Sequence, residues 1–96
     1  MLAEERRKEA ERRRLERERL ERLEKARVGR LLAQAKSLRE ADEIRAYVSA
    51  VRERQAALNE PLSATAFQQW ADWALSQADR IDPVLSGSFR TVQDDD

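Results

Sequence analysis

The sequence contains no cysteine and no histidine, and it has only two glycines and two prolines. Disulfides, a cysteine nucleophile, a histidine general base and a Cys/His metal cluster are therefore excluded. Carboxylates remain, but Asp79 with Asp82, and Glu40 with Asp42 and Glu43, lack the dense oxygen-ligand spacing of a calcium loop. We expect a protein that is not an enzyme and that uses no metal, cofactor or small-molecule substrate.

Long apolar runs are also missing. No stretch approaches the roughly 18 consecutive apolar residues of a membrane span, and no apolar segment resembling a secretory signal follows Met1. The expected location is cytoplasmic, without membrane contact.

Large apolar side chains are scarce and unevenly distributed. Hydrophobic residues make up 41% of the chain, but 15 of them are alanines, and only five of the 24 larger ones precede Arg27. Small domains with so little core depend on disulfides, metals or association, and the first two are largely excluded here. The sequence therefore predicts a homo-oligomer, most simply a two-fold dimer, or docking on a partner protein.

Charge is plentiful and separated along the chain. Charged residues form 40% of the sequence, and the net charge of zero divides into +4 for residues 1–30 and −4 for residues 31–96. Such a chain can associate head to tail or with a charged partner, within a screening length of about 8 to 10 Å.

Residues 3–30 form an Arg/Glu-rich tract of good helix formers. Its Glu-to-Lys/Arg pairs at i, i+4 include Glu9–Arg13, and those at i, i+3 include Glu11–Arg14 and Glu16–Arg19. Through Arg19 the only larger apolar residues after Met1 are Leu2 and Leu15. The tract therefore predicts a solvated single helix that needs no partner along this stretch.

Two apolar stripes follow at helical spacing. The first contains Leu20, Leu23, Val28, Leu31, Ala35 and Leu38, and the second contains Ala41, Ile44, Val48, Val51, Gln55 and Leu58. The register slips between the two, and Ser37 with Glu40 fits a capping box. We expect a break or kink at Lys36–Ser37, which ends a first helix of about 35 residues; a continuous helix is the alternative.

A helical hairpin is predicted beyond that point. Pro61 ends the second helix, Ser63 caps a third helix over residues 64–81, and Asp82-Pro83 stops it. That helix places Phe67, Trp70, Ala71, Ala74, Ala78 and Ile81 on one face. The predicted organisation is all-α and bundle-like or coiled-coil-like, with a long helix at 1–36, a hairpin domain at 37–89 and a disordered acidic tail at 90–96.

The basic residues of the first helix allow a second hypothesis. Arg6, Arg7, Lys8, Arg12, Arg13 and Arg14 lie within nine residues, and a basic helix before a leucine stripe is typical of basic-zipper DNA readers. Glu9 and Glu11 among them would repel phosphates, which favours a solvated helix or coiled-coil arm. Contact with nucleic acid or an anionic surface, and pairing with a charged protein, stay open as alternatives.

The chain has two tryptophans, Trp70 and Trp73, which lie three residues apart on the predicted helix. Their size favours a packing role in a thin core, and tryptophan is also enriched in interface hot spots. Tyr47 is expected at the edge of the core. The predicted interface residues are Leu20, Leu23, Leu31, Leu38, Ile44, Val48, Val51, Phe67, Trp70 and Trp73.

Three segments carry a resemblance: Ile44 to Val48, Trp70 to Ala74, and Ala78 to Pro83. Together with the preceding Arg/Glu helix, they resemble the C-terminal region of a group of uncharacterised bacterial proteins. The resemblance implies an absent N-terminal portion, to which the charged helix would act as a spacer, and it implies no activity. The function predicted is a non-catalytic oligomerisation and protein-interaction module; the alternative is a nucleic-acid accessory module using Arg6 to Arg14.

Overall fold

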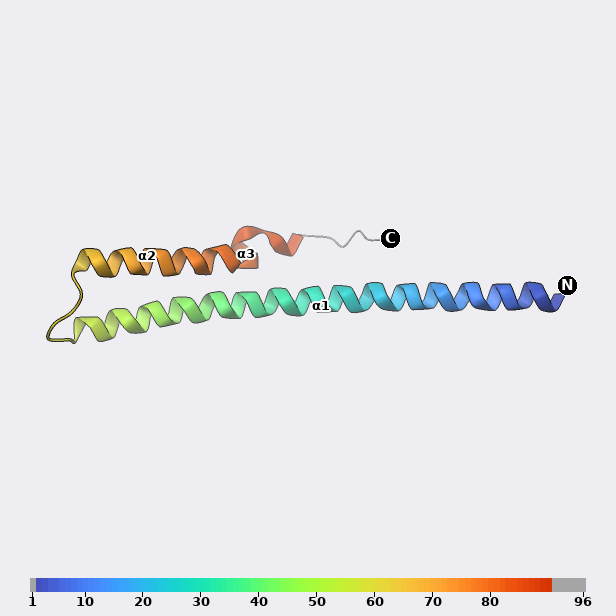
Figure 1. Ribbon diagram of the computed structural model, residues 1–96, viewed down its shortest axis with the longest axis horizontal. Coiled ribbons are helices and arrows are strands. Elements are labelled where there is room, and N and C mark those ends of the chain that lie inside the picture. Colours follow the sequence, from blue (N-terminus) through green and yellow to red (C-terminus); the bar gives the residue numbers. More distant parts are fainter. Residues whose placement is uncertain (1, 91–96) are drawn as a thin grey trace. The chain divides into compact units, whose positions relative to one another are not determined.

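The computed structural model describes residues 2–90 (Figure 1). Over this range the chain is all-α, as the sequence predicts, and no strand occurs. Helix α1 spans Leu2–Ala56, α2 spans Ala64–Ile81, α3 spans Pro83–Ser86, and the 3-10 turn η1 spans Ser88–Arg90. The chain divides into two compact units, one ending at Leu32 and the other beginning at Ala33.

The predicted break at Lys36–Ser37 is wrong, because α1 is one continuous helix of 55 residues. Lys36, Leu38 and Glu40 are good helix formers, and neither glycine nor proline lies near them. Keeping the backbone hydrogen bonds here costs less than ending the helix at a capping box. The predicted first and second helices are therefore one element.

Ion pairs between side chains one turn apart follow α1 from Glu4 to Arg19. Glu9 pairs with Arg12 and, at 3.2 Å, with Arg13, while Arg14 Nη1 lies 3.0 Å from Glu18 Oε1. The predicted pairs Glu9–Arg13, Glu11–Arg14 and Glu16–Arg19 are all present. Such exposed pairs each stabilise a helix by about 0.2 to 0.5 kcal/mol, so this stretch depends on local interactions.

In the second unit, α2 folds back along residues 33–56 of α1 (Figure 1). The connection is closed by Gln55, whose Oε1 accepts a hydrogen bond from Leu62 N at 3.1 Å. Ser63 caps α2 as predicted, with its Oγ accepting from Ala66 N at 3.0 Å. The predicted bounds of this helix, 64–81, are confirmed.

A small apolar core joins the two helices of the hairpin. Val48 of α1 is buried together with Phe67, Ala71 and Ala74 of α2. Four partly buried residues pack around them: Ile44, Val51, Trp70 and Leu75. Val48 is the largest side chain described as fully buried, so the hairpin holds little apolar volume of its own.

The chain after α2 is short and keeps regular structure as far as Arg90. Gly87 adopts the left-handed conformation with φ of 77° and ends α3. Gln34 Nε2 of α1 donates to Ser88 O at 3.1 Å, which ties η1 to the hairpin. Arg90 belongs to η1, so the predicted disordered tail does not begin there, and its other residues, 91–96, lie outside the described range.

None of the helices within residues 2–90 combines the length and the apolar character that crossing a lipid bilayer requires.

Candidate protein interface

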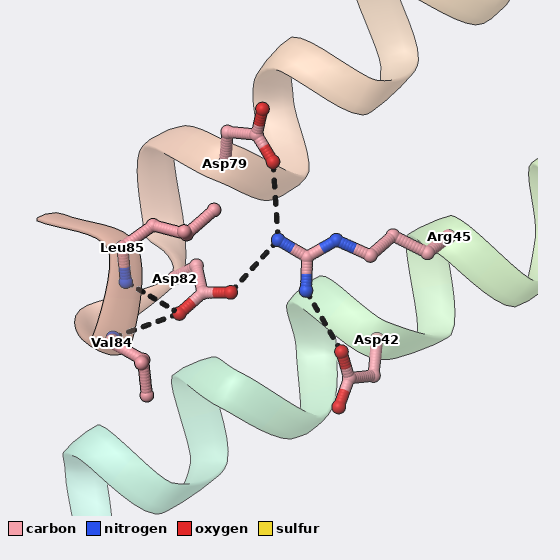
Figure 2. A network of polar contacts seen from close by, with 6 residues as sticks. All are labelled: Asp42, Arg45, Asp79, Asp82, Val84 and Leu85. Atoms are coloured by element: carbon pink, nitrogen blue, oxygen red, sulfur yellow. Dashed lines mark hydrogen bonds and ion pairs between the residues drawn. The ribbon is translucent and has the colours of Figure 1, made fainter.

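Arg45 is the centre of a polar network that joins α1 to the end of α2 (Figure 2). Its Nη2 donates to Asp82 Oδ2 at 2.8 Å and to Asp79 Oδ1 at 3.1 Å. Its Nη1 donates to Asp42 Oδ1 at 2.8 Å, one turn earlier on α1. The side chain of Asp82 is only 5% exposed, so its carboxylate is buried where α2 meets α1.

Asp82 also organises the backbone where α2 becomes α3. Its Oδ1 accepts from Val84 N at 2.8 Å and from Leu85 N at 3.2 Å, while its own N–H donates to Ala78 O. One residue therefore ends α2 and caps α3. The Arg45 contact then fixes both helix ends against α1.

The protonation states follow from these contacts. Hydrogen bonds that Arg45 donates to Asp82 first, then to Asp79 and Asp42, raise its pKa above the ordinary value. The Arg45 hydrogen bond is the largest cause that lowers the pKa of Asp82; the backbone N–H groups of Leu85 and Val84 act in the same direction and burial acts against them. Both shifts favour the charged forms of Arg45 and Asp82, which form the ion pair between α1 and the end of α2.

A shallow groove lies between α1 and α2. Aromatic and aliphatic side chains line it: Ile44 and Tyr47 from α1, and Trp70, Trp73 and Ile81 from α2. Glu40 and Glu43 of α1 and Gln77 of α2 complete the rim. Of the lining residues in the described part of the chain, two are acidic and none is basic.

Large aromatic surface is exposed along this groove. Tyr47 is 63% exposed and Trp73 is 60% exposed, whereas Trp70 is half-buried. Trp70 is fixed by an edge-on contact with Tyr47, with ring centroids 6.1 Å apart, and by a tilted contact with Phe67 at 6.0 Å. The groove therefore combines one half-buried aromatic ring, Trp70, with exposed aromatic surface at Tyr47 and Trp73.

The predicted interface residues occupy three different environments. Val48 and Phe67 are buried in the hairpin's own core, with Val51 packed against it, so they hold the chain together internally. Ile44, Trp70 and Trp73 come together in the groove. In the first unit Leu20 and Leu31 are exposed and Leu23 is half-buried, and in the second Leu38 is half-buried.

Sequence reasoning misses two features of this surface. The periodicity predicts Tyr47 at the core edge, but its place beside Trp70 and Trp73 in the groove depends on how α2 lies against α1. Arg45 has no sequence signal beyond its position within the Ile44–Val48 segment, since two of its partners lie 34 and 37 residues away. Asp82-Pro83 ends α2 as the sequence predicts, but the sequence does not indicate the ion pair between Asp82 and Arg45.

The basic residues of the alternative hypothesis lie along the first part of α1. Arg7 pairs with Glu4, Arg12 and Arg13 with Glu9, and Arg14 with Glu11 and Glu18. The remaining members, Arg6 and Lys8, are exposed on the same helix. Local neutralisation of four of the six cations weakens the attraction that phosphate binding needs.

In the range 2–90, no group of three or more acidic side chains is arranged so that it could hold a metal ion. Asp42, Asp79 and Asp82 converge on the guanidinium of Arg45.

Comparison of the chain with protein-family models, with curated proteins and with solved structures gives no match.

Proposed function

We propose that this chain is a helical association module that binds a second copy of itself through the groove between α1 and α2. The observation that carries the proposal is the pair of exposed aromatic rings, Tyr47 and Trp73, beside a fixed Trp70. Tryptophan and tyrosine are enriched among the residues that dominate binding energy, especially where a pocket already orders them.

The thin core supports the same conclusion. Two helices can bury only the stripe between them, and here that stripe is mostly alanine, with Val48 and Phe67 as its large members. The groove leaves apolar surface that a further helix would cover, as in a helical bundle. Covering it removes about 25 cal/mol of unfavourable hydration for each Å² of apolar surface buried.

A second copy suits the groove by charge. The rim is acidic, and residues 1–30 of the chain carry a net charge of +4 together with exposed leucines. Opposite charges at an interface mainly raise the association rate and the specificity, while the buried aromatic anchors supply affinity. The chain thus contains both an acceptor surface and segments that complement it.

Sedimentation equilibrium over a range of concentrations tests the proposal, with Trp73→Ala as the variant. We expect a dimer for the wild type, and a dissociation constant raised by about thirtyfold or more for Trp73→Ala, since a hot-spot residue contributes roughly 2 kcal/mol or more. Phe89→Ala removes another exposed aromatic ring, 55% exposed and outside the groove, and is the matched control. A wild type that stays monomeric at high concentration contradicts the proposal.

A further inference from the structure

The α1 side of the groove is a single stripe. Glu40, Glu43, Ile44 and Tyr47 follow one another at i, i+3, i+4 and i+7, so they share one face of the helix. The stripe combines acidic and apolar positions along its length. A helix that pairs with it must therefore present cations and apolar residues in a matching order.

The first unit contains such a segment. Leu20, Leu23, Arg27 and Leu31 are spaced i, i+3, i+7 and i+11 on α1, which also places them on one face. Leu20 is 53% exposed and Leu31 is 63% exposed. This face is apolar with a cation in its middle, which is the complement of the groove stripe.

Register decides whether the two stripes fit. In an antiparallel pairing that places Arg27 of one copy opposite Glu43 of the other, Leu23 lies opposite Tyr47 and Arg30 lies opposite Glu40. A shift of three residues in one direction places Glu24 opposite Glu43, and a shift of four in the other places Leu31 opposite Glu43. The shift of three also places Arg27 opposite Glu40 and Leu20 opposite Tyr47, but it brings two glutamates together at Glu43. The shift of four places no cation opposite either glutamate. Of these three registers, the first alone places a cation opposite both Glu40 and Glu43.

We infer that residues 20–31 of a second copy occupy the groove, antiparallel to residues 40–47 of α1, with Arg27 paired to Glu43 and Leu23 packed on Tyr47 and Trp73. The inference rests on the proposed function and names the segment that serves it. Each copy carries both segments, so the same contact is available twice, with the roles of the two copies exchanged.

A competing arrangement, groove against groove, is disfavoured by charge. It would bring Glu40 and Glu43 of one copy toward the same residues of the other, since both belong to the lining. Like charges at a contact oppose association. Residues 20–31 bring Arg27 and Arg30 to Glu43 and Glu40 instead, so attraction replaces this repulsion.

A charge exchange tests the pairing. One variant carries Arg27→Glu and Arg30→Glu, and the other carries Glu40→Lys and Glu43→Lys. Each alone places like charges at both copies of the contact, so we expect the dissociation constant to rise by about tenfold or more. An equimolar mixture restores opposite charges at both contacts, and we expect it to form a heterodimer of near wild-type affinity in sedimentation equilibrium.

Two further measurements make the result decisive. Far-UV circular dichroism of each variant monitors whether the helices are retained, and all four substitutions on one chain should restore the homodimer if the pairs are direct. If the wild type dimerises and Trp73→Ala weakens the dimer, but Arg27→Glu with Arg30→Glu dimerises normally or the mixture does not recover, the groove is an interface and residues 20–31 do not occupy it. A monomeric wild type overturns the proposed function itself.

Discussion

Asp82 combines three structural roles in one side chain. It accepts two backbone N–H groups of α3, ends α2 and pairs with Arg45 of α1. A carboxylate that accepts several hydrogen bonds is stabilised in its charged form, and this stabilisation exists only in the folded chain. Asp82 therefore links the folding of the hairpin to pH.

The pH dependence has a definite sign. The folded-state pKa of Asp82 is lowered, chiefly by Arg45, from the ordinary value of 3.8. Its contribution to stability is fully present above that ordinary value and is lost as the pH falls through the lower folded value. The substitution Asp82→Asn keeps the cap because asparagine caps as well as aspartate, but the new side chain cannot ionise.

We therefore expect Asp82→Asn to lower the melting temperature by several degrees at pH 7. The difference from the wild type should shrink as the pH falls from about 5 toward 2, as followed by thermal unfolding monitored by circular dichroism. Asp72→Asn removes a different carboxylate, exposed and bonded to Gln68 at 2.6 Å, and is the matched control. A difference between Asp82→Asn and the wild type that stays constant with pH would show that the ion pair contributes nothing.

What the sequence reveals at this scale depends on whether a signal is local. The Ser63 cap and the i, i+3 and i, i+4 pairs of the charged tract are predictable because their partners are within one turn. The Arg45 network is not, because it requires knowing which faces of α1 and α2 meet. The same reason explains why the sequence does not assign Tyr47 to the groove.

At the scale of elements, the two glycines occupy opposite situations. Gly29 lies inside α1, where an added Cβ meets nothing within 4 Å, whereas Gly87 has φ of 77° at the end of α3. Glycine inside a helix costs conformational entropy, but at positive φ it avoids the strain that other residues incur. The same substitution should therefore have opposite effects at the two positions.

We expect Gly29→Ala to stabilise α1 by roughly 0.5 to 1 kcal/mol and Gly87→Ala to destabilise the hairpin by about 1 to 2 kcal/mol. Circular dichroism at 222 nm during heating measures the effect of Gly29→Ala on α1. Urea unfolding followed by tryptophan fluorescence measures the effect of Gly87→Ala on the hairpin. Each variant is the other's control, since both add one methyl group. Equal changes in the same direction would contradict the assignment of the two backbone conformations.

The sequence predicts some of the elements and misses others, since α3 and η1 have no predicted counterpart and α1 has no break. The bounds of α2 follow from Pro61, Ser63 and Pro83, which are strong local signals. The continuity of α1 does not follow, because a capping box is compatible with both a helix start and a helix interior. Over residues 36–40 intrinsic propensity outweighs that signal.

At the scale of the whole molecule, the two units differ in what stabilises them. Residues up to Leu32 depend on helix propensity and on ion pairs within the helix, whereas the unit from Ala33 onward has a core and cross-helix bonds. Local opening costs little where contacts are local and approaches the global unfolding free energy where a core must be broken. Hydrogen exchange should therefore vary strongly along the chain.

In one segment, the hydrogen-exchange rates should also depend on the protein concentration. We expect slow exchange over residues 41–56 and 67–81 and fast exchange over residues 4–18 at every concentration, because the core protects the first two ranges and only local interactions protect the third. Residues 20–31 should exchange fast when the chain is dilute and slowly when it is dimeric, since the proposed groove contact would then cover them. Mass spectrometry of peptides after exchange, at protein concentrations below and above the dissociation constant of the dimer, measures these rates.

The variant Trp73→Ala leaves residues 20–31 unchanged but weakens the groove contact. It should abolish the concentration dependence over residues 20–31 alone. Protection that appears with concentration over residues 4–18 instead would place the contact on the Arg/Glu tract and contradict the register argued from Arg27 and Glu43.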